Sequence, residues 1–124
     1  MNRLIKFRGK TKGSKLWVYG YYYTKQNKHF ILDSKGHSWN VYKKSIGQFT
    51  GLIDENGVEI YEEDKIKIWS KYDKERYDIG EVFYHNRFAE FGVRGTNSLG
   101  YWFLHQYNIE VIGNIFESEV EKQK

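Results

Sequence analysis

Hydrophobic and polar residues alternate with a period of two along much of the chain, which is the pattern of β-strands. Residues 4–8 and 16–23 both show it, and they are rich in the aromatic and β-branched residues that suit a pleated sheet. A polar segment with a glycine, residues 10–15, lies between them. The pattern therefore predicts a β-hairpin here, followed by short strands at residues 30–32 and 38–42.

The same alternation predicts which side chains of residues 16–23 face the interior. If Trp17, Tyr19 and Tyr21 share one face of a strand, we expect that face to be the core. Tyr22 lies on the opposite face and is then expected at the surface.

Residues 46–60 differ from the strands before them, because glycine recurs there at Gly47, Gly51 and Gly57. Asn56 followed by Gly57 is the strongest short-range hairpin signal, since both central positions of a type I′ turn require positive φ. We therefore expect a tight turn here.

Beyond residue 60 the strand pattern returns, interrupted by a highly charged connection at residues 70–78. Short strands at this spacing are typical of a small barrel or roll. The five expected strands are residues 65–69, 79–84, 87–93, 101–104 and 109–116.

Composition excludes several classes of protein. The 124 residues include no cysteine and no proline, but 8 Phe, 11 Tyr and 4 Trp. Without cysteine there is no disulfide scaffold, thiolate metal site or cysteine nucleophile. The aromatic content argues against disorder despite a mean hydropathy of −0.77. No apolar run approaches the length of about 18 residues that spans a membrane, and no signal peptide is recognisable, so we expect a cytoplasmic protein.

The net charge of +4 hides two regions of opposite sign. Residues 1–46 carry 11 Lys and Arg against one acid, Asp33, which gives +10. Residues 47–124 carry 9 Lys and Arg against 15 Asp and Glu, which gives −6. Such asymmetry suggests a basic binding surface or an electrostatic contact between the two regions.

Four segments carry a recognisable pattern: residues 5–10 (IKFRGK), 16–20 (LWVYG), 46–62 (IGQFTGLIDENGVEIYE) and 110–117 (EVIGNIFE). In this order they resemble the YopX-like family of phage and prophage proteins, and the resemblance covers about residues 3–117. The resemblance implies a phage-encoded, mainly β, cytoplasmic protein of the bacterial host, with an SH3-like β-roll in its C-terminal part. It brings no established biochemical activity.

One position departs from the family pattern. The family usually has Glu-Gly-Asp where this chain has Glu62, Glu63 and Asp64. If the glycine serves a turn of positive φ, Glu63 must adopt that conformation or avoid it.

Taken together, these features predict an all-β protein with an N-terminal β-meander followed by an SH3-like β-roll or small barrel. The expected parts are a basic, aromatic-rich meander (1–46), a glycine-rich connection with the Asn-Gly turn (47–57), the roll (58–117) and a polar tail (118–124).

Catalytic motifs are not recognisable. Glu59, Glu62, Glu63 and Asp64 could serve acid–base or metal chemistry, but a solvated acidic turn explains them as well. The four histidines lack the spacing of a zinc site, and the glycines lack that of a P-loop. We expect a non-enzymatic binding module with no cofactor, and keep a metal-dependent hydrolase using Glu62, Glu63 or Asp64 as the least favoured alternative.

Basic residues interleaved with aromatic ones in residues 6–44 are the clearest functional signal, because single-stranded nucleic acid is bound by cations on phosphates and rings on bases. The candidate residues for nucleic-acid or partner binding are Lys6, Arg8, Lys10, Lys12, Lys15, Tyr22, Lys25, Lys28, Trp39, Lys43 and Lys44. A solvated basic face explains the same residues without a ligand. A phage or host protein is an alternative partner, and a homo-oligomer joined by its oppositely charged regions is another.

Overall fold

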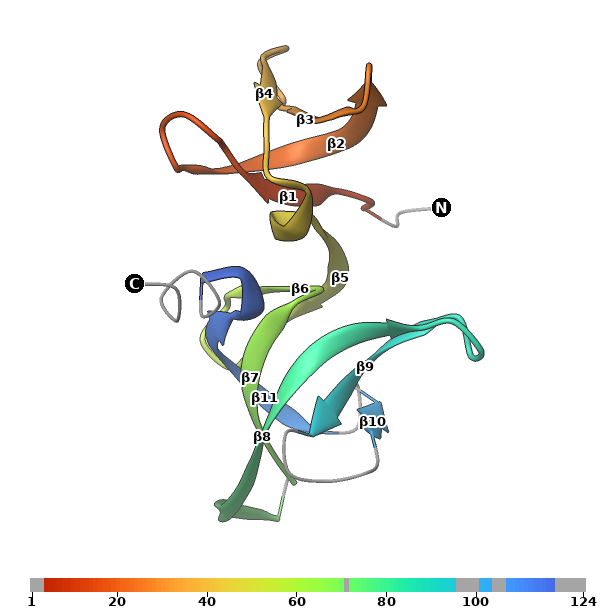
Figure 1. The fold of residues 1–124 in the computed structure, drawn as a ribbon. Helices are drawn as coiled ribbons and strands as arrows, with labels where there is room; N and C mark the ends of the chain where they lie inside the picture. The colour runs from red at the N-terminus through yellow and green to blue at the C-terminus, as the bar shows by residue number, and fades with distance from the viewer. Residues whose placement is uncertain (1–3, 71, 96–100, 104–106, 118–124) are drawn as a thin grey trace. The chain divides into compact units, whose positions relative to one another are not determined.

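The computed structural model describes residues 4–70, 72–95, 101–103 and 107–117. The chain divides into two compact units, Met1–Gly51 (unit 1) and Leu52–Lys124 (unit 2), and Figure 1 shows that strands make up most of both. Because the described secondary structure is almost entirely antiparallel sheet, the predicted all-β class is confirmed.

The described part of unit 1 contains four complete strands, a 3₁₀ turn and most of a fifth strand. These elements are β1 (Phe7–Lys10), β2 (Trp17–Lys25), β3 (Lys28–Leu32), β4 (Ser38–Asn40), η1 (Lys43–Ser45) and β5 (Gly47–Ile53). Neighbouring strands follow the order β4-β3-β2-β1-β5, so β1 to β4 form the predicted meander. The predicted first hairpin is confirmed, with Phe7 opposite Gly20 and Lys10 opposite Trp17.

A two-residue turn that the hydrophobic pattern does not reveal joins β2 to β3. Lys25 lies opposite Lys28, and the residues between them, Gln26 and Asn27, have φ values of 52° and 63°. Two consecutive positive φ values are those of a type I′ turn, the geometry that suits the twist of a hairpin. This turn therefore forms without glycine.

The buried face of the unit 1 sheet is centred on Ile31 and Val41, which are fully buried. Gly9 belongs to this face, since a Cβ built there would lie 3.0 Å from the side chain of Val41. The rings of Phe7 and Tyr22 approach to 5.9 Å between centroids. We call this side of the sheet the buried face.

Trp17, Tyr19 and Tyr21 lie on the other face, so the expectation that they form the core is wrong. Tyr19 is 45% exposed and Tyr21 is 68% exposed, whereas Tyr22 is half-buried. The period-two pattern shows that neighbouring residues of the strand point to opposite faces of the sheet. It does not show which of the two faces another segment covers. Here the covering segment contains Val41, and it packs on the side of Gly9.

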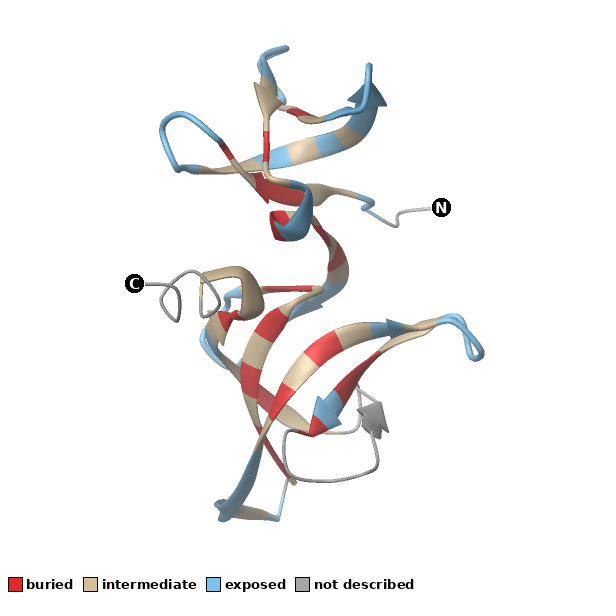
Figure 2. Cartoon of the chain, viewed as in Figure 1, coloured by how far each residue is buried: buried red, intermediate tan, exposed pale blue. Residues whose placement is uncertain are grey.

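Unit 2 is built on a five-stranded antiparallel sheet. The complete strands of this unit are β6 (Glu59–Tyr61), β7 (Asp64–Ser70), β8 (Asp73–His85), β9 (Glu90–Gly95), β10 (Tyr101–Phe103) and β11 (Asn108–Asn114), and all of them except β6 belong to this sheet. The sheet order is β10-β9-β8-β7-β11, while β6 pairs with β5. Buried and half-buried residues alternate along β7, and along residues 79–83 of β8, in Figure 2. The predicted SH3-like character of this unit remains a prediction.

The core of unit 2 consists of aliphatic side chains from five strands. Its buried members are Ile60, Ile66, Ile68, Val82, Val93 and Ile109. The expected charged connection at residues 70–78 is wrong for most of its length, because β8 begins at Asp73, which pairs with Ser70. Strand pairing here overrides the low strand propensity of charged residues.

The turn at residues 54–57 differs from the expected type I′ geometry. Gly57 has a φ of 80°, but Asn56 does not have a positive φ. Instead, Asp54 builds the turn: its Oδ1 accepts hydrogen bonds from the backbone N–H groups of Asn56 and Val58. Its Oδ2 accepts another from Val111 on β11, so one nearly buried carboxylate ties this turn to the last strand.

Glu63 adopts a positive φ, which is one of the two outcomes expected at this departure from the family pattern. Its φ is 73°. Its backbone N–H donates to the carbonyl oxygen of Val82, and its own carbonyl accepts from the N–H of Ile115. The turn into β7 therefore forms with a glutamate, which has a Cβ, at the position of positive φ.

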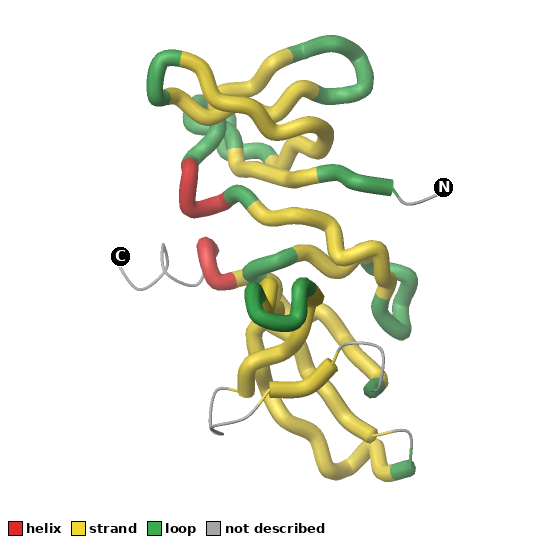
Figure 3. The backbone as a smooth tube through the Cα atoms, turned by 90° about the vertical axis from the view of Figure 1, so that its right-hand side faces the viewer, coloured by secondary structure: helices red, strands yellow, loops and turns green. Residues whose placement is uncertain are grey.

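Helical structure is confined to very short turns such as η1, as Figure 3 shows for the described residues. Residues 47–57, expected as a connection, contain β5 and the turn at Asp54. The expected tail at residues 118–124 lies outside the described residues.

Candidate nucleic-acid interface

Strand register gathers cations and aromatic rings on the side of the unit 1 sheet opposite the buried face. Arg8 lies directly across from Tyr19, and Lys10 lies across from Trp17, so these side chains share one face. That face continues along β2 through the alternate residues. We call it the basic-aromatic face, and its members are Lys6, Arg8, Lys10, Trp17, Tyr19, Tyr21 and Tyr23.

Contacts between cations and rings organise the end of this face that is formed by β1. The Arg8 guanidinium carbon lies 4.7 Å from the centre of a Trp17 ring, and Lys10 Nζ lies 5.3 Å from it. Lys6 Nζ lies 5.2 Å from the ring centre of Phe49 on β5. Such contacts hold long, positively charged side chains against flat aromatic surfaces.

The three cations differ in burial. Arg8 is only 9% exposed, whereas Lys6 and Lys10 are half-buried. Arg8 therefore contributes a largely buried charge to the face, and Lys6 and Lys10 contribute partly exposed charges.

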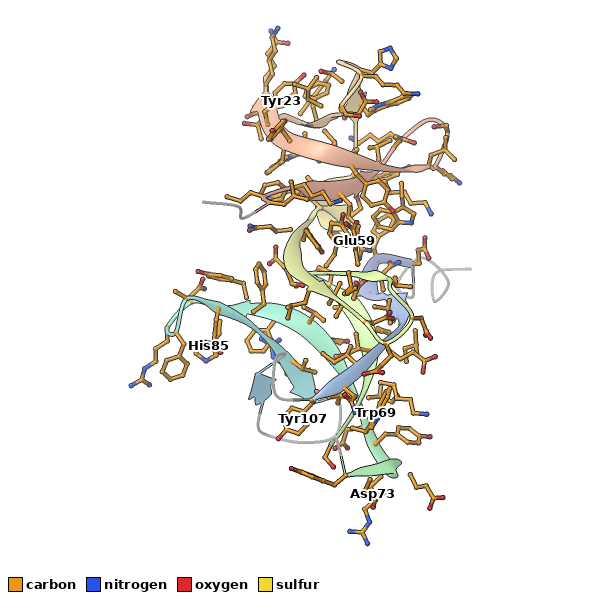
Figure 4. The ribbon with its side chains drawn as sticks, turned by 180° about the vertical axis from the view of Figure 1, so that it is seen from behind. Tyr23, Glu59, Trp69, Asp73, His85 and Tyr107 are labelled. Atoms are coloured by element: carbon orange, nitrogen blue, oxygen red, sulfur yellow. The ribbon has the colours of Figure 1, made fainter. Side chains whose placement is uncertain are left out.

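Tyrosines form the other part of the face, along β2. Tyr19 and Tyr21 are exposed, and Tyr23 is 37% exposed. Tyr23 stacks on Phe30 with ring centres 5.2 Å apart, and its hydroxyl donates to Ser38 Oγ. Figure 4 labels Tyr23 on β2. These two contacts hold the Tyr23 side chain in place at its end of the face.

The one acid of unit 1 lies in a turn, where it is engaged with neighbouring donors. The Asp33 carboxylate accepts hydrogen bonds of 2.9 Å from the Trp39 indole N–H and from the backbone N–H groups of His37 and Lys35. These bonds, that of Trp39 foremost, hold the pKa of Asp33 below its ordinary value of 3.8. Asp33 therefore stays ionised and bonded within its turn at neutral pH.

The remaining predicted cations lie in loops and at a hairpin tip. Lys12 and Lys15 belong to the loop between β1 and β2, and Lys12 Nζ lies 5.9 Å from the ring centre of Tyr42. Lys43 and Lys44 are exposed on η1. Lys25 and Lys28 are exposed and face each other at the end of the β2–β3 hairpin.

Tyr22 and Trp39, the two aromatic residues of the predicted set, lie apart from the basic-aromatic face. The half-buried Tyr22 hydroxyl is 2.6 Å from Nδ1 of His29, and the two rings stack. Trp39 pairs with Ile31, a residue of the buried face, and donates to Asp33. Both side chains have structural partners there.

Sequence reasoning left Tyr19, Tyr21 and Tyr23 out of the predicted binding set. The glycine of the first strand could have indicated which face of the sheet these tyrosines occupy. Gly9 lies between Arg8 and Lys10, and the face of a strand that carries a glycine has room for a covering segment. The tyrosines lie on the opposite face, where Tyr19 and Tyr21 are exposed.

The carboxylates of residues 59–64 have structural roles in unit 2. Asp64 is buried and its Oδ2 accepts from the backbone N–H of Tyr61 at 2.8 Å. The Tyr61 hydroxyl donates to Oε1 of Glu59, which Figure 4 labels on β6. Across the described residues, no group of three or more His, Asp or Glu side chains is arranged to hold a metal ion.

A shallow pocket of about 310 Å³ in unit 2 is lined by Trp69, Tyr107 and several charged residues. Asp73 and Arg76, both part of the lining, form an ion pair of 3.5 Å between Oδ2 and Nε. Figure 4 shows Trp69, Tyr107 and Asp73 at the same end of the unit. The charged residues that line this pocket are of both signs and partly neutralise each other. The basic-aromatic face is therefore the stronger candidate site.

The fold and this face define the class: an all-β protein with two antiparallel sheets, one of which presents cations beside exposed rings. The family follows from the sequence. The sequence model of the YopX protein matches residues 6–120, so the chain belongs to the YopX family and the resemblance is confirmed.

No curated protein matches the chain. Among solved structures, the chain is similar to the crystal structure of protein EF1440 from Enterococcus faecalis. The TM-score is 0.52 and the sequence identity 22%, over 94% of this chain and 96% of that one. This similarity shows a shared fold. Among the described residues, no helix is both long and apolar enough to cross a membrane.

Proposed function

We propose that the protein is a non-enzymatic binding module whose unit 1 binds nucleic acid. The observation that carries the proposal is the basic-aromatic face, where Lys6 and Lys10 flank the buried charge of Arg8 beside exposed tyrosines. Unit 1 has 11 basic residues and one acid, and that acid is engaged in its own turn.

Phosphate groups suit this surface for an electrostatic reason. Each cation that neutralises a phosphate releases a counterion, so affinity for nucleic acid falls as salt rises. A face that gathers several cations attracts a polyanion at long range. The proposal therefore entails binding that is sensitive to salt.

Fluorescence anisotropy with labelled single- and double-stranded DNA and RNA, at about 50 mM salt and above, tests this proposal. Lys10→Glu should weaken binding strongly, because it reverses a charge on the face. Arg87→Glu is the matched control, because it changes the net charge equally at an exposed turn of unit 2. No salt-sensitive binding to any probe, or equal loss in both variants, would end the proposal.

Self-assembly is the second candidate function, and two observations favour it. The two units carry charges of opposite sign, +10 and −6, and unit 2 exposes several aliphatic side chains, among them Leu52, Ile53, Val58 and Ile112. Basic and acidic units of different copies could pair head to tail. Light scattering at low and high salt tests this, and a strict monomer under both conditions would remove it.

The non-enzymatic character is supported by the carboxylates of residues 59–64, since Asp64 and Glu59 hold the backbone and hydroxyl of Tyr61. From the family resemblance alone, we also propose a phage or prophage origin and a location in the cytoplasm of the bacterial host. Identifying the nucleic acids and proteins that co-purify with the chain from induced host cells tests both statements.

A further inference from the structure

We propose that the ligand of the basic-aromatic face is single-stranded nucleic acid, whose bases stack on Tyr19 and Tyr21. The inference rests on the proposed function and deepens it, because it names the class of nucleic acid and the residues that select it. Neither tyrosine belongs to the set that the sequence predicted.

Exposure of the two rings is the first observation. Tyr21 is the more exposed and Tyr19 follows, although both belong to a strand in the middle of the unit 1 sheet. Large aromatic side chains on the outside of a central strand offer flat apolar surface to a ligand. Base–ring stacking is tolerant of sequence, since every base has a π-face.

Spacing along β2 favours an extended single strand over a duplex. Alternate residues of a strand lie about 6.8 Å apart, so Tyr19 and Tyr21 are separated by roughly twice the distance between stacked bases of DNA. Bases already stacked in a duplex leave no room for two rings at this spacing. An extended strand with its bases unstacked can place one base on each ring.

Cations lie where the phosphates of such a strand would run. Adjacent strands of a sheet are about 4.8 Å apart, so the register places Arg8 beside Tyr19 and Lys10 beside Trp17, along one side of the row of rings. Lys25 and Lys28 lie at the far end of β2. The nine residues of β2 span about 27 Å, enough for roughly four nucleotides, the lower limit for small single-strand-binding folds.

The neighbouring aromatic residues have other roles. Trp17 carries the side chains of Arg8 and Lys10 on its ring, so it positions cations. Tyr23 is stacked on Phe30. The proposal assigns stacking to Tyr19 and Tyr21 because they are the two most exposed rings of the face.

The experiment compares Tyr21→Leu, Tyr21→Phe and Tyr19→Leu with the wild type by anisotropy. The probes are labelled oligothymidylate and oligouridylate of about eight nucleotides and a duplex of about 16 base pairs. Tyr72→Leu is the matched control, because Tyr72 is a 97% exposed tyrosine of unit 2. Circular dichroism verifies that each variant is folded.

The proposal expects Tyr21→Leu and Tyr19→Leu each to weaken single-strand binding by about 5-fold to 150-fold, the loss of one stacked base. Tyr21→Phe, which keeps the ring, and Tyr72→Leu should bind as the wild type does. Duplex binding should be weaker than single-strand binding and insensitive to all four variants. The two single-strand probes show whether DNA, RNA or both are bound.

Equal single-strand binding by Tyr21→Leu and the wild type would overturn the inference, as would tighter binding to the duplex. In either case the proposed function would stand, since charge-dependent binding by unit 1 would remain. Failure of every probe to bind the wild type would overturn both. Loss of binding in Tyr72→Leu equal to that in Tyr21→Leu would also overturn the inference.

Discussion

Single residues with unusual backbone conformations or hydrogen bonds form several turns of this chain. Glu63 is the clearest, since it holds a φ of 73° at the position where the family resemblance implies a glycine. A residue with a Cβ in this region costs about 1–2 kcal/mol relative to its preferred conformations. The backbone hydrogen bonds that Glu63 makes to Val82 and Ile115 fix this conformation from both sides.

Glu63→Gly should therefore stabilise the protein. Relief of the strained φ outweighs the greater backbone entropy of glycine in the unfolded chain, and the net gain is about 0.5–1 kcal/mol in the free energy of unfolding. Urea denaturation measures it. Glu62→Gly is the control: its φ is not positive, so it should destabilise by a similar amount. A loss of stability in Glu63→Gly would contradict the strain argument.

Asp33 gives a pH-dependent prediction at the same scale. Its pKa is lowered chiefly by the hydrogen bond from Trp39, so its stabilising contribution is fully present above pH 3.8 and is lost as the pH falls through the lower folded-state pKa. Trp39→Phe should raise the pKa of Asp33 toward 3.8, as followed by NMR of the Asp33 carboxyl carbon. A wild-type pKa at or above 3.8 would refute the assigned cause.

At the scale of elements, hairpins and their close contacts decide which surfaces are covered. Gly20 lies between Tyr19 and Tyr21, and a Cβ built there would lie 1.9 Å from the carbonyl oxygen of Leu32 on β3. No side chain fits at this position. The strand that presents the tyrosines therefore depends on a glycine for its pairing with β3.

Gly20→Ala should destabilise the protein by about 3 kcal/mol, because the clash is with backbone and cannot be relieved by a rotamer change. Thermal unfolding followed by circular dichroism measures it. Gly13→Ala is the control, since nothing lies within 4 Å of a Cβ built at Gly13. Comparable stability of both variants would show that the contact at Leu32 relaxes easily.

The strand positions in the first hairpin could be predicted because the alternation of hydrophobic and polar residues follows directly from the pleat of a β-strand. The side of the sheet that is covered could not, since the covering residue Val41 lies far along the chain from Gly9. The turn at Gln26 and Asn27 escaped prediction because it lacks glycine. The sequence identified the cations of the candidate site. It assigned the wrong face to the tyrosines of that site, because the covering segment lies far along the chain from the first hairpin.

At the scale of the whole molecule, charge follows the division into units. Residues 47–51 carry no charged side chain, so the boundary after Gly51 gives the same +10 and −6 as the change of sign in the sequence. Unit 1 combines this charge with exposed rings, and unit 2 supplies the larger aliphatic core. Our proposal thus assigns ligand binding to the basic unit 1, and unit 2 is the acidic unit.

Mapping of backbone amide chemical shifts in ¹⁵N-labelled protein, during titration with oligothymidylate of about eight nucleotides, tests the central claim most directly. The account predicts shifts concentrated in β1 and β2, strongest near Lys10, Tyr19 and Tyr21, that disappear as salt is raised. Shifts concentrated in unit 2, or no shifts at low salt, would contradict it.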